Sequence, residues 1–306
     1  AGLHTQDPDD LAYWLDRVQA GNLYVNRGIT GAIVRRQPFG GWRLSQVGPG
    51  AKAGGPSYLS TLVDWEPVFQ PPRANVKLAG LHQRVSNLIE SSTPQLDFLE
   101  FDRIRAGANS DQRAWEAELG LSLDVSSLGV ERNVLRYRPT QTLVRLADDG
   151  TMGQLVRVLA AAARARATVR ISTSQPLPPG LERLVTAPAP VLRVEEIVVE
   201  SDAAFHDRLR SGAAVAPVGP AALDERGREV DDGLVRSGEP TRRIRLCGTD
   251  AGLRPLLAGN PTIAVYDAPI TVEGRLELMP FLREQAVSIT AHRFGNPDES
   301  FATLEV

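Results

Sequence analysis

The sequence has little of several features that mark whole classes of protein. Cys247 is the single cysteine among 306 residues, which excludes an internal disulfide and a cysteine-based structural zinc site. No uninterrupted apolar stretch approaches the ~18 residues that a membrane-spanning helix requires. The 34 basic and 37 acidic side chains give a formal net charge of −3, so no cationic excess is present to neutralise nucleic-acid phosphates or anionic lipid. We therefore expect no nucleic-acid partner and no membrane insertion.

The N-terminus also lacks a targeting pattern. No basic stretch followed by an apolar run is present, and the chain starts with Ala1 instead of methionine. A single thiol without a signal peptide is simplest to explain in the reducing cytoplasm. The same start is consistent with Ala1 being an interior residue of a longer polypeptide.

The residues that are present suit a folded protein of two parts. Hydrophobic residues make up 42% of the sequence, enough for a buried core. The segment EPVFQPPR contains three prolines, which stop regular structure, so we place the first boundary near residues 66–75. Before it we expect an amphipathic helix at 8–20 and a glycine-rich loop at 28–56. The segment YLSTLVDW, at 58–65, reads as a strand.

After the boundary, strands alternate with helices of 8–17 residues. This alternation predicts βαβ units and a mainly parallel sheet. The fold class is therefore α/β, with residues 76–285 as a doubly wound domain and 286–306 as a final docking strand and tail. The expected strands are TLVRLA, ATVRIST, RVEEIVVES, RRIRLCG and TIAVYD, followed by AVSITAHRF at the end. The expected helices are LHQRVSNLIESS, GTMGQLVRVLAAAARAR, DAAFHDRLRSG and TDAGLRPLLAGN.

No catalytic or metal-binding pattern stands out from the residues alone. In the glycine-rich region Lys52 is followed by Ala53, where a phosphate-binding P-loop needs a hydroxyl residue. Cys247 ends a predicted buried strand, which favours a structural cysteine over a nucleophile. The four scattered histidines show no metal-ligand spacing. The carboxylates Glu195, Glu196, Asp231 and Asp232 are most simply interpreted as solvated charge.

One segment resembles a known family. GNLYVNRGITGAIVRRQPFGGWRLSQVGPGAKAGGPSYL, residues 21–59, is similar to the C-terminal end of the catalytic domain of aldehyde dehydrogenases, in the L-glutamate γ-semialdehyde (1-pyrroline-5-carboxylate) dehydrogenase branch. GNLYVNR, TGA and QPFGG occur together and in order. In that family TGA is an anchor loop whose backbone N–H groups hold the substrate carboxylate, which implies substrate-binding roles for Gly31 and Ala32. The aromatic residue of PFGG lines the aldehyde tunnel, which implies the same for Phe39.

The resemblance also has consequences for catalysis and assembly. The nucleophilic cysteine, the general-base glutamate and the NAD-binding domain of the family all lie upstream of GNLYVNR, so we expect no catalytic, cofactor-binding or metal residue here. The chain alone should be inactive, NAD should be bound by upstream residues of a parent enzyme, and FAD should be present only if a proline dehydrogenase module also lies upstream. The segment 58–65 corresponds to the last strand of the family's oligomerisation arm and implies a homo-oligomer.

The rest of the chain resembles the C-terminal extension of long, bifunctional proline utilisation A enzymes. ERNVLRYRP at 131–139 and REQAVSITAHRFG at 283–295 carry this similarity. In that family the extension is an aldehyde-dehydrogenase-like domain without catalytic function, which supports assembly and helps to close the tunnel for the reactive intermediate. Residues 1–70 are then the end of a catalytic domain, and 76–285 are a non-catalytic Rossmann-like domain.

Two other interpretations remain open. The chain could be a free-standing, non-enzymatic dimerisation or scaffold module that keeps the family's surface. It could also be a degenerate cofactor domain that still binds a dinucleotide. The proline-rich turn SQPLPPG after ATVRIST speaks against the latter, because a dinucleotide needs small residues and a helix N-terminus at that place.

Overall fold

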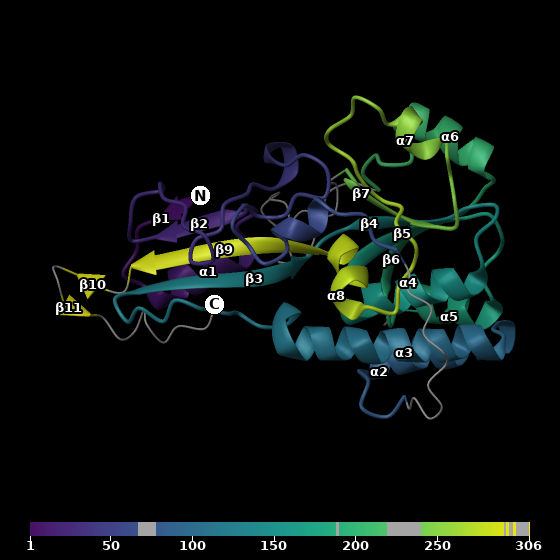
Figure 1. Cartoon of the computed structure of the whole chain (residues 1–306), viewed down its shortest axis with the longest axis horizontal. Helices are drawn as coiled ribbons and strands as arrows, with labels where there is room; N and C mark the ends of the chain where they lie inside the picture. The colour runs from purple at the N-terminus through teal and green to yellow at the C-terminus, as the bar shows by residue number, and fades with distance from the viewer. Residues whose placement is uncertain (67–77, 188–189, 219–239, 291, 294–295, 298–305) are drawn as a thin grey trace, which may run out of the picture.

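Two β-sheets organise the part of the chain that the structure describes. The computed structural model describes residues 1–66, 78–187, 190–218, 240–290, 292–293, 296–297 and 306 (Figure 1). A four-stranded sheet holds the N-terminal segment, and a five-stranded parallel sheet carries helices on both faces. The fold is therefore α/β, as the alternation of strands and helices predicts.

The four-stranded sheet brings distant parts of the chain together. Its strands are β1 (Gly2–Leu3), β2 (Asn22–Val25), β3 (Glu131–Pro139) and β9 (Leu282–Thr290), in the order β1-β2-β9-β3. Strand β9 is parallel to β2 and antiparallel to β3. The docking strand expected from residue 286 is thus part of β9, and it lies beside the N-terminal β2 (Figure 1).

Helix α1 (Pro8–Arg17) packs on this sheet. The Asp7 side chain caps the helix by accepting a hydrogen bond from the backbone N–H of Asp9. Leu11 and Leu15, four residues apart, point to the same side of the helix. They enter a core that also contains Leu23, Val25, Val134, Val287 and Ile289. The N-terminal segment, β3 and β9 therefore share one hydrophobic core.

The parallel sheet has a doubly wound topology. Its strands are β4 (Thr142–Leu146), β5 (Thr168–Thr173), β6 (Arg193–Val199), β7 (Arg243–Cys247) and β8 (Ala264–Tyr266). Their order is β6-β5-β4-β7-β8, and all neighbouring pairs are parallel. The chain therefore winds outward from β4 first to one edge and then to the other, as in a dinucleotide-binding fold.

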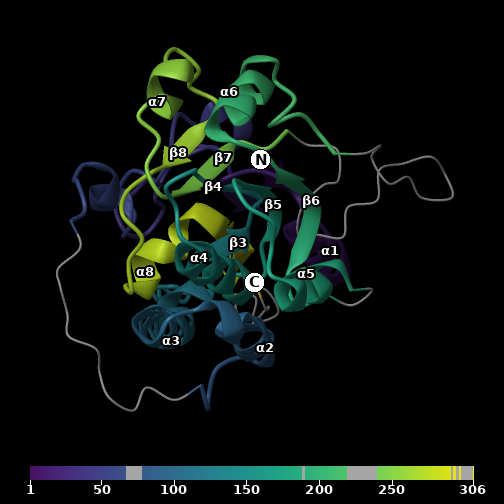
Figure 2. The same ribbon diagram turned by 90° about the vertical axis from the view of Figure 1, so that its right-hand side faces the viewer.

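Helices cover both faces of this sheet (Figure 2). One face carries α2 (Gln83–Ser92), α3 (Phe98–Ala114), α4 (Met152–Arg164) and α5 (Pro179–Thr186), and the other carries α6 (Asp202–Arg210) and α7 (Leu253–Leu256). Adjacent residues of β4 enter different cores, because successive strand side chains point to opposite faces. Val144 packs in the core of α2 and α4, whereas Leu143 packs in the core of α6.

The alanine-rich α4 lies at the centre of the larger core. Its start is fixed by a capping box, in which the Thr151 side chain accepts from the Gln154 backbone and the Gln154 side chain accepts from the Thr151 backbone. The helix is buried on nearly all sides between the sheet and the α2–α3 pair. Its small side chains permit this close approach.

The segment at 58–65 corrects a prediction. Instead of a strand it forms a short 3₁₀ helix, η2 (Tyr58–Thr61), followed by irregular backbone. The Ser60 hydroxyl donates to the Ser57 carbonyl, and the Thr61 hydroxyl donates to the Tyr58 carbonyl at 2.8 Å. A β-ladder needs a neighbouring strand, and none of the described strands pairs with this segment. Local hydrogen bonds therefore satisfy part of this backbone instead.

Several other elements differ from expectation. Helices α3 and α5 were not predicted, and α5 begins at Pro179, inside the segment SQPLPPG that was expected to be a turn. The helix expected at 249–260 is reduced to the single turn of α7. Strand β9 begins before residue 286, inside the region assigned to the middle domain. The remaining short elements are η1 (Arg43–Ser45), η3 (Thr93–Gln95), the π turn η4 (Trp115–Leu119), α8 (Gly274–Glu277), η5 (Met279–Phe281), β10 (His292–Arg293) and β11 (Asn296–Pro297). The proposed boundary at 66–75 falls almost entirely outside the described residues.

Candidate functional site

The predicted anchor loop follows β2 and closes on itself by backbone hydrogen bonds. Ile33 and Gln37 exchange two of them, with N–O distances of 3.0 and 2.7 Å. Two residues before this pair, Gly31 has φ +125°, a conformation that side-chain-bearing residues rarely adopt. Its carbonyl accepts a hydrogen bond of 2.8 Å from the Tyr24 hydroxyl on β2. The loop therefore holds Gly31 and the adjacent, exposed Ala32 on an ordered backbone.

Phe39 presents its ring outward from a fixed backbone position. Its side chain is 55% exposed. Its backbone exchanges hydrogen bonds of 3.0 and 2.8 Å with Ala53. On either side, the Asn22 amide binds the Pro38 carbonyl at 3.0 Å and the Gly40 N–H at 3.1 Å. An exposed aromatic ring on a braced backbone is available to contact a substrate or a neighbouring polypeptide.

Lys52 is a buried amine that supports the same segment. Its Nζ donates to the Gly40 carbonyl at 2.6 Å and to Asn22 Oδ1 at 2.8 Å. Its backbone N–H donates to Glu284 Oε2 on β9 at 2.7 Å. Burial lowers the pKa of Lys52 to about 7, against the opposing charge of Glu284. A neutral amine has two hydrogens, which matches the two acceptors that surround it.

This shift predicts a pH dependence of stability. In the unfolded chain Lys52 holds its proton up to a pKa near 10.5, whereas in the folded chain it releases the proton near pH 7. The unfolded state thus binds more protons between these two pH values. The free energy of unfolding therefore falls as the pH is lowered from about 10.5 to 7, and it rises as the pH is raised through the same range. We expect the free energy of unfolding of the wild type, relative to Lys52→Met, to increase by roughly 2 kcal/mol from pH 7 to pH 9. Urea titrations of both proteins across this range measure it, and a constant difference contradicts the assignment.

The carboxyl end of the parallel sheet, where dinucleotides bind in such folds, is closed by acidic side chains. Between β4 and β7, the Asp149 carboxylate accepts from the Thr249 backbone at 2.8 Å and from the Thr249 hydroxyl. A Cβ on Gly248 would lie 2.5 Å from Asp149 Oδ1, so the turn has no spare room. Nearby, Asp250 accepts a 2.7 Å hydrogen bond from His206. A pyrophosphate that approached these turns would meet the carboxylates of Asp149 and Asp250, which carry charge of the same sign.

The remaining polar candidates have structural surroundings. Cys247 is fully buried on β7, and burial raises the pKa of its thiol to about 12, which makes it a poor nucleophile. Glu196 corrects the interpretation as solvated charge, because Arg170 and Arg208 both donate to it. Asp231 and Asp232 lie outside the described residues. Among the residues with described positions, no group of three histidine, cysteine or acidic side chains could hold a metal.

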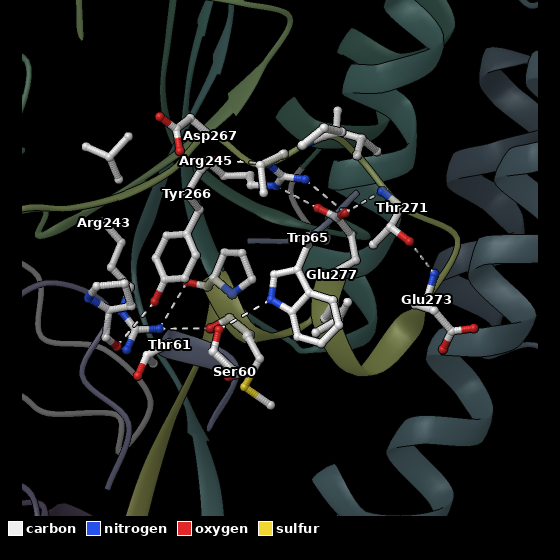
Figure 3. Close-up of a pocket in the computed structure, with 18 of the residues that line it drawn as sticks. Ser60, Thr61, Trp65, Arg243, Arg245, Tyr266, Asp267, Thr271, Glu273 and Glu277 are labelled. Atoms are coloured by element: carbon white, nitrogen blue, oxygen red, sulfur yellow. Dashed lines mark hydrogen bonds and ion pairs between the residues drawn. The ribbon is translucent and has the colours of Figure 1, made fainter. Parts of the chain in front are cut away.

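A large cavity that the sequence did not predict lies beside β7 and β8. It has a volume of about 1620 Å³ and is bounded by the segment around Ser60 and Trp65, by α3 and by the loop before α8 (Figure 3). Its buried charges are already paired: Arg245 binds Glu277 at 2.7 and 2.9 Å, and Arg243 donates to three backbone carbonyls. The cavity is a space between the N-terminal segment and the α/β domain, and its most buried arginines are held by other groups of the chain.

The segment that carries the anchor loop also exposes many apolar side chains. Eleven large hydrophobic residues between 29 and 65 are between 41% and 75% exposed. We call this group the exposed apolar set; it consists of Ile29, Ile33, Val34, Phe39, Leu44, Val47, Tyr58, Leu59, Leu62, Val63 and Trp65. Such a concentration is typical of a surface that contacts another polypeptide.

No helix in the described part is long and apolar enough to cross a bilayer.

Comparisons with known proteins find relatives for the first part of the chain and for longer stretches of it. Residues 1–67 match the aldehyde dehydrogenase family. The chain is 38% identical over 165 residues to the bifunctional protein PutA of Rhizobium meliloti, a match that covers 52% of this chain and 12% of the relative. It is 50% identical over 56 residues to a 1-pyrroline-5-carboxylate dehydrogenase of Bacillus cereus (strain B4264), covering 18% of this chain and 10% of the relative.

A solved structure resembles nearly the whole chain. The structure of proline utilization A (PutA) from Corynebacterium freiburgense covers 96% of this chain with a TM-score of 0.63 and 31% sequence identity, whereas the match covers only 23% of that protein. The matches to the two curated relatives likewise cover only 12% and 10% of their length. The expected resemblance is confirmed: the first 67 residues match the aldehyde dehydrogenase family, and the chain as a whole is similar to part of PutA.

Proposed function

We propose that this chain is the C-terminal portion of an NAD-dependent L-glutamate γ-semialdehyde (1-pyrroline-5-carboxylate) dehydrogenase, which performs the second step from proline to glutamate. It supplies the substrate anchor loop, an oligomerisation segment at 58–65 and an α/β domain that seals the tunnel for the intermediate. The similarity to PutA and to 1-pyrroline-5-carboxylate dehydrogenase supports this assignment. A soluble cytoplasmic enzyme is the setting that the single cysteine favours.

The exposed apolar set is the observation that carries the proposal. These side chains belong to the segment that carries the anchor loop, from residue 29 to residue 65, and leaving them in water is unfavourable. An upstream aldehyde dehydrogenase module that covers them completes both the hydrophobic interface and the substrate site. A neighbouring subunit covers the part at 58–65, where Tyr58, Leu59 and Leu62 are exposed in the single chain.

Within such an enzyme the chain binds and orients substrate. None of the described residues accepts a hydrogen bond from the backbone N–H of Gly31 or Ala32, so both donors are available to the α-carboxylate of the semialdehyde. Phe39 forms part of the wall along which the aldehyde carbon chain lies. The hydride acceptor NAD and the thiolate nucleophile come from the upstream part, because the acidic turn at Asp149 and the buried Cys247 suit neither role. FAD belongs to the protein only if a proline dehydrogenase module precedes it.

Activity measurements on two forms of the protein test the proposal. The isolated chain should form no NADH from NAD and the semialdehyde. For the second form, a PutA relative is cut where the matched region begins, and this chain is joined to the remaining aldehyde dehydrogenase part. The joined protein should form NADH. The truncated relative by itself serves as the control. NADH formation by the isolated chain contradicts the proposal, and so does an inactive joined protein that is folded and binds NAD.

The alternative is a free-standing, non-enzymatic dimerisation or scaffold module. The exposed apolar set also fits this function, because two copies could cover one another's surfaces. Stable self-association of the chain in sedimentation, together with an inactive joined protein, favours this alternative.

A further inference from the structure

We propose that Glu131, on strand β3 of the C-terminal region, is a positioning residue for the anchor loop and sets the geometry of its substrate-binding backbone. The expected effect on substrate binding rests on the proposed function, whereas the contacts of Glu131 involve only residues of this chain.

The two ends of the anchor loop converge on the Glu131 carboxylate. Arg27, just before the loop, donates from Nη1 to Glu131 Oε2 at 2.8 Å. Arg36, at the end of the loop, donates to the other oxygen, Oε1. The side chain of Glu131 is only 13% exposed, and those of Arg27 and Arg36 are 22% and 35% exposed. One carboxylate thus joins the entry and the exit of a loop that is about 100 residues away in the sequence.

The surroundings of Glu131 hold its carboxylate in place. Asn133, two residues along β3, donates from Nδ2 to Glu131 Oε1 at 3.1 Å. Burial by itself raises the pKa of Glu131, but the hydrogen bonds from Asn133 and Arg36 and the two arginine charges outweigh it and lower the pKa below its ordinary value. The carboxylate is therefore ionised at neutral pH and pairs with both guanidinium groups.

A second contact from the same strand reaches the base of the loop. Gln37 Nε2 donates to Asn133 Oδ1 at 2.9 Å, and both side chains are buried. Gln37 Oε1 lies 3.2 Å from the position that a Cβ on Gly31 would occupy, so this amide lies directly beside Gly31. Strand β3 therefore contacts the loop at both ends through Glu131, and it holds Gln37, the neighbour of Gly31, through Asn133.

Few other interactions restrain the loop. Its described backbone contacts are the Ile33–Gln37 pair, one bond from the Arg35 N–H to the Gly54 carbonyl at 2.8 Å, and the bond from the Tyr24 hydroxyl to the Gly31 carbonyl at 2.8 Å. Most side chains from residue 28 to residue 35 are exposed. The ion pairs of Glu131 are consequently a large share of what fixes the loop, and a carboxylate anchor needs its N–H donors placed before substrate arrives.

The test compares Glu131→Gln with Glu196→Gln. Glu196 is a matched control, because it also accepts from two arginines, Arg170 and Arg208, but lies on β6 in the other sheet. In the full chain, Glu131→Gln should raise hydrogen exchange at the amides of Ile33, Arg35 and Gln37 by about tenfold. Exchange in α4 should not change, which shows that the variant remains folded. Arg27→Met, which removes one arm of the contact, should give a smaller increase at the same amides.

The catalytic arm uses the chain joined to its upstream module. Glu131→Gln should raise KM for the semialdehyde by about fivefold or more with kcat and the KM for NAD nearly unchanged, and Glu131→Asp should recover part of the loss. Unchanged exchange in the loop overturns the positioning role. Raised exchange with an unchanged KM in an active enzyme overturns it as well. A third outcome is raised exchange in the variant together with a wild-type joined protein that is folded but inactive. This outcome contradicts the proposed function, whereas the contact between Glu131 and the loop still holds.

Discussion

Replacement of Asp111 by alanine is expected to lower the free energy of unfolding by about 3–5 kcal/mol, because it leaves a buried guanidinium without its counter-charge. Asp111 on α3 and Arg157 on α4 form a two-point ion pair with distances of 2.7 and 2.8 Å. Their side chains are only 1% and 4% exposed. Arg157 also donates to the Thr271 carbonyl at 3.1 Å, so the pair holds α3, α4 and the loop before α8 together.

An exposed ion pair provides the control for this prediction. Asp207 pairs with Arg210 on α6 with side chains that are 77% and 58% exposed. Because exposed pairs are screened by water, Asp207→Ala should change the free energy of unfolding by no more than about 0.5 kcal/mol. Denaturant titrations of both variants measure the difference. A loss below about 1 kcal/mol for Asp111→Ala shows that the buried pair contributes little.

Gly31→Val should raise KM for the semialdehyde by about tenfold or more in the joined enzyme, with the KM for NAD unchanged. Gly31 has φ +125°, and an added Cβ would lie 3.2 Å from Gln37 Oε1. A branched side chain there both strains the backbone and blocks approach of the carboxylate to the loop N–H groups.

A matched glycine separates these effects from a general loss of stability. Gly259 also has a positive φ, of +85°, but a Cβ there would meet no atom within 4 Å. Gly259→Val should therefore cost stability through backbone strain without changing KM. If Gly31→Val leaves KM for the semialdehyde unchanged, the anchor loop has been assigned to the wrong residues.

The parallel sheet could be predicted because its pattern is local. The strands are short runs, and β4, β6 and β7 are each followed by a helix signal. Strand β4 shows why the run is apolar: Leu143 and Val144 enter opposite cores, as in a strand with helices on both faces. Helix α3 could not be predicted in this way. Its buried positions include Asp102, Gly107 and Asp111, which resemble a solvated segment until Arg157 is placed against them.

The candidate site was predicted only in part, for a related reason. The resemblance pointed to Gly31, Ala32 and Phe39 because the motif residues are contiguous in the sequence. Glu131 was not identified, because its contacts to Arg27 and Arg36 span 104 and 95 residues and a charged residue by itself resembles surface. The strand expected at 58–65 was wrong for the single chain, since β-propensity does not supply the partner strand that a ladder needs.

The coding DNA immediately upstream of Ala1, translated in frame, tests the central claim most directly. The account predicts that it encodes a dinucleotide-binding domain and a cysteine nucleophile, which would join the anchor loop and the exposed apolar set to the rest of an aldehyde dehydrogenase. A start codon directly before Ala1 contradicts the account and makes the chain a free-standing module, whose binding partner must then be identified.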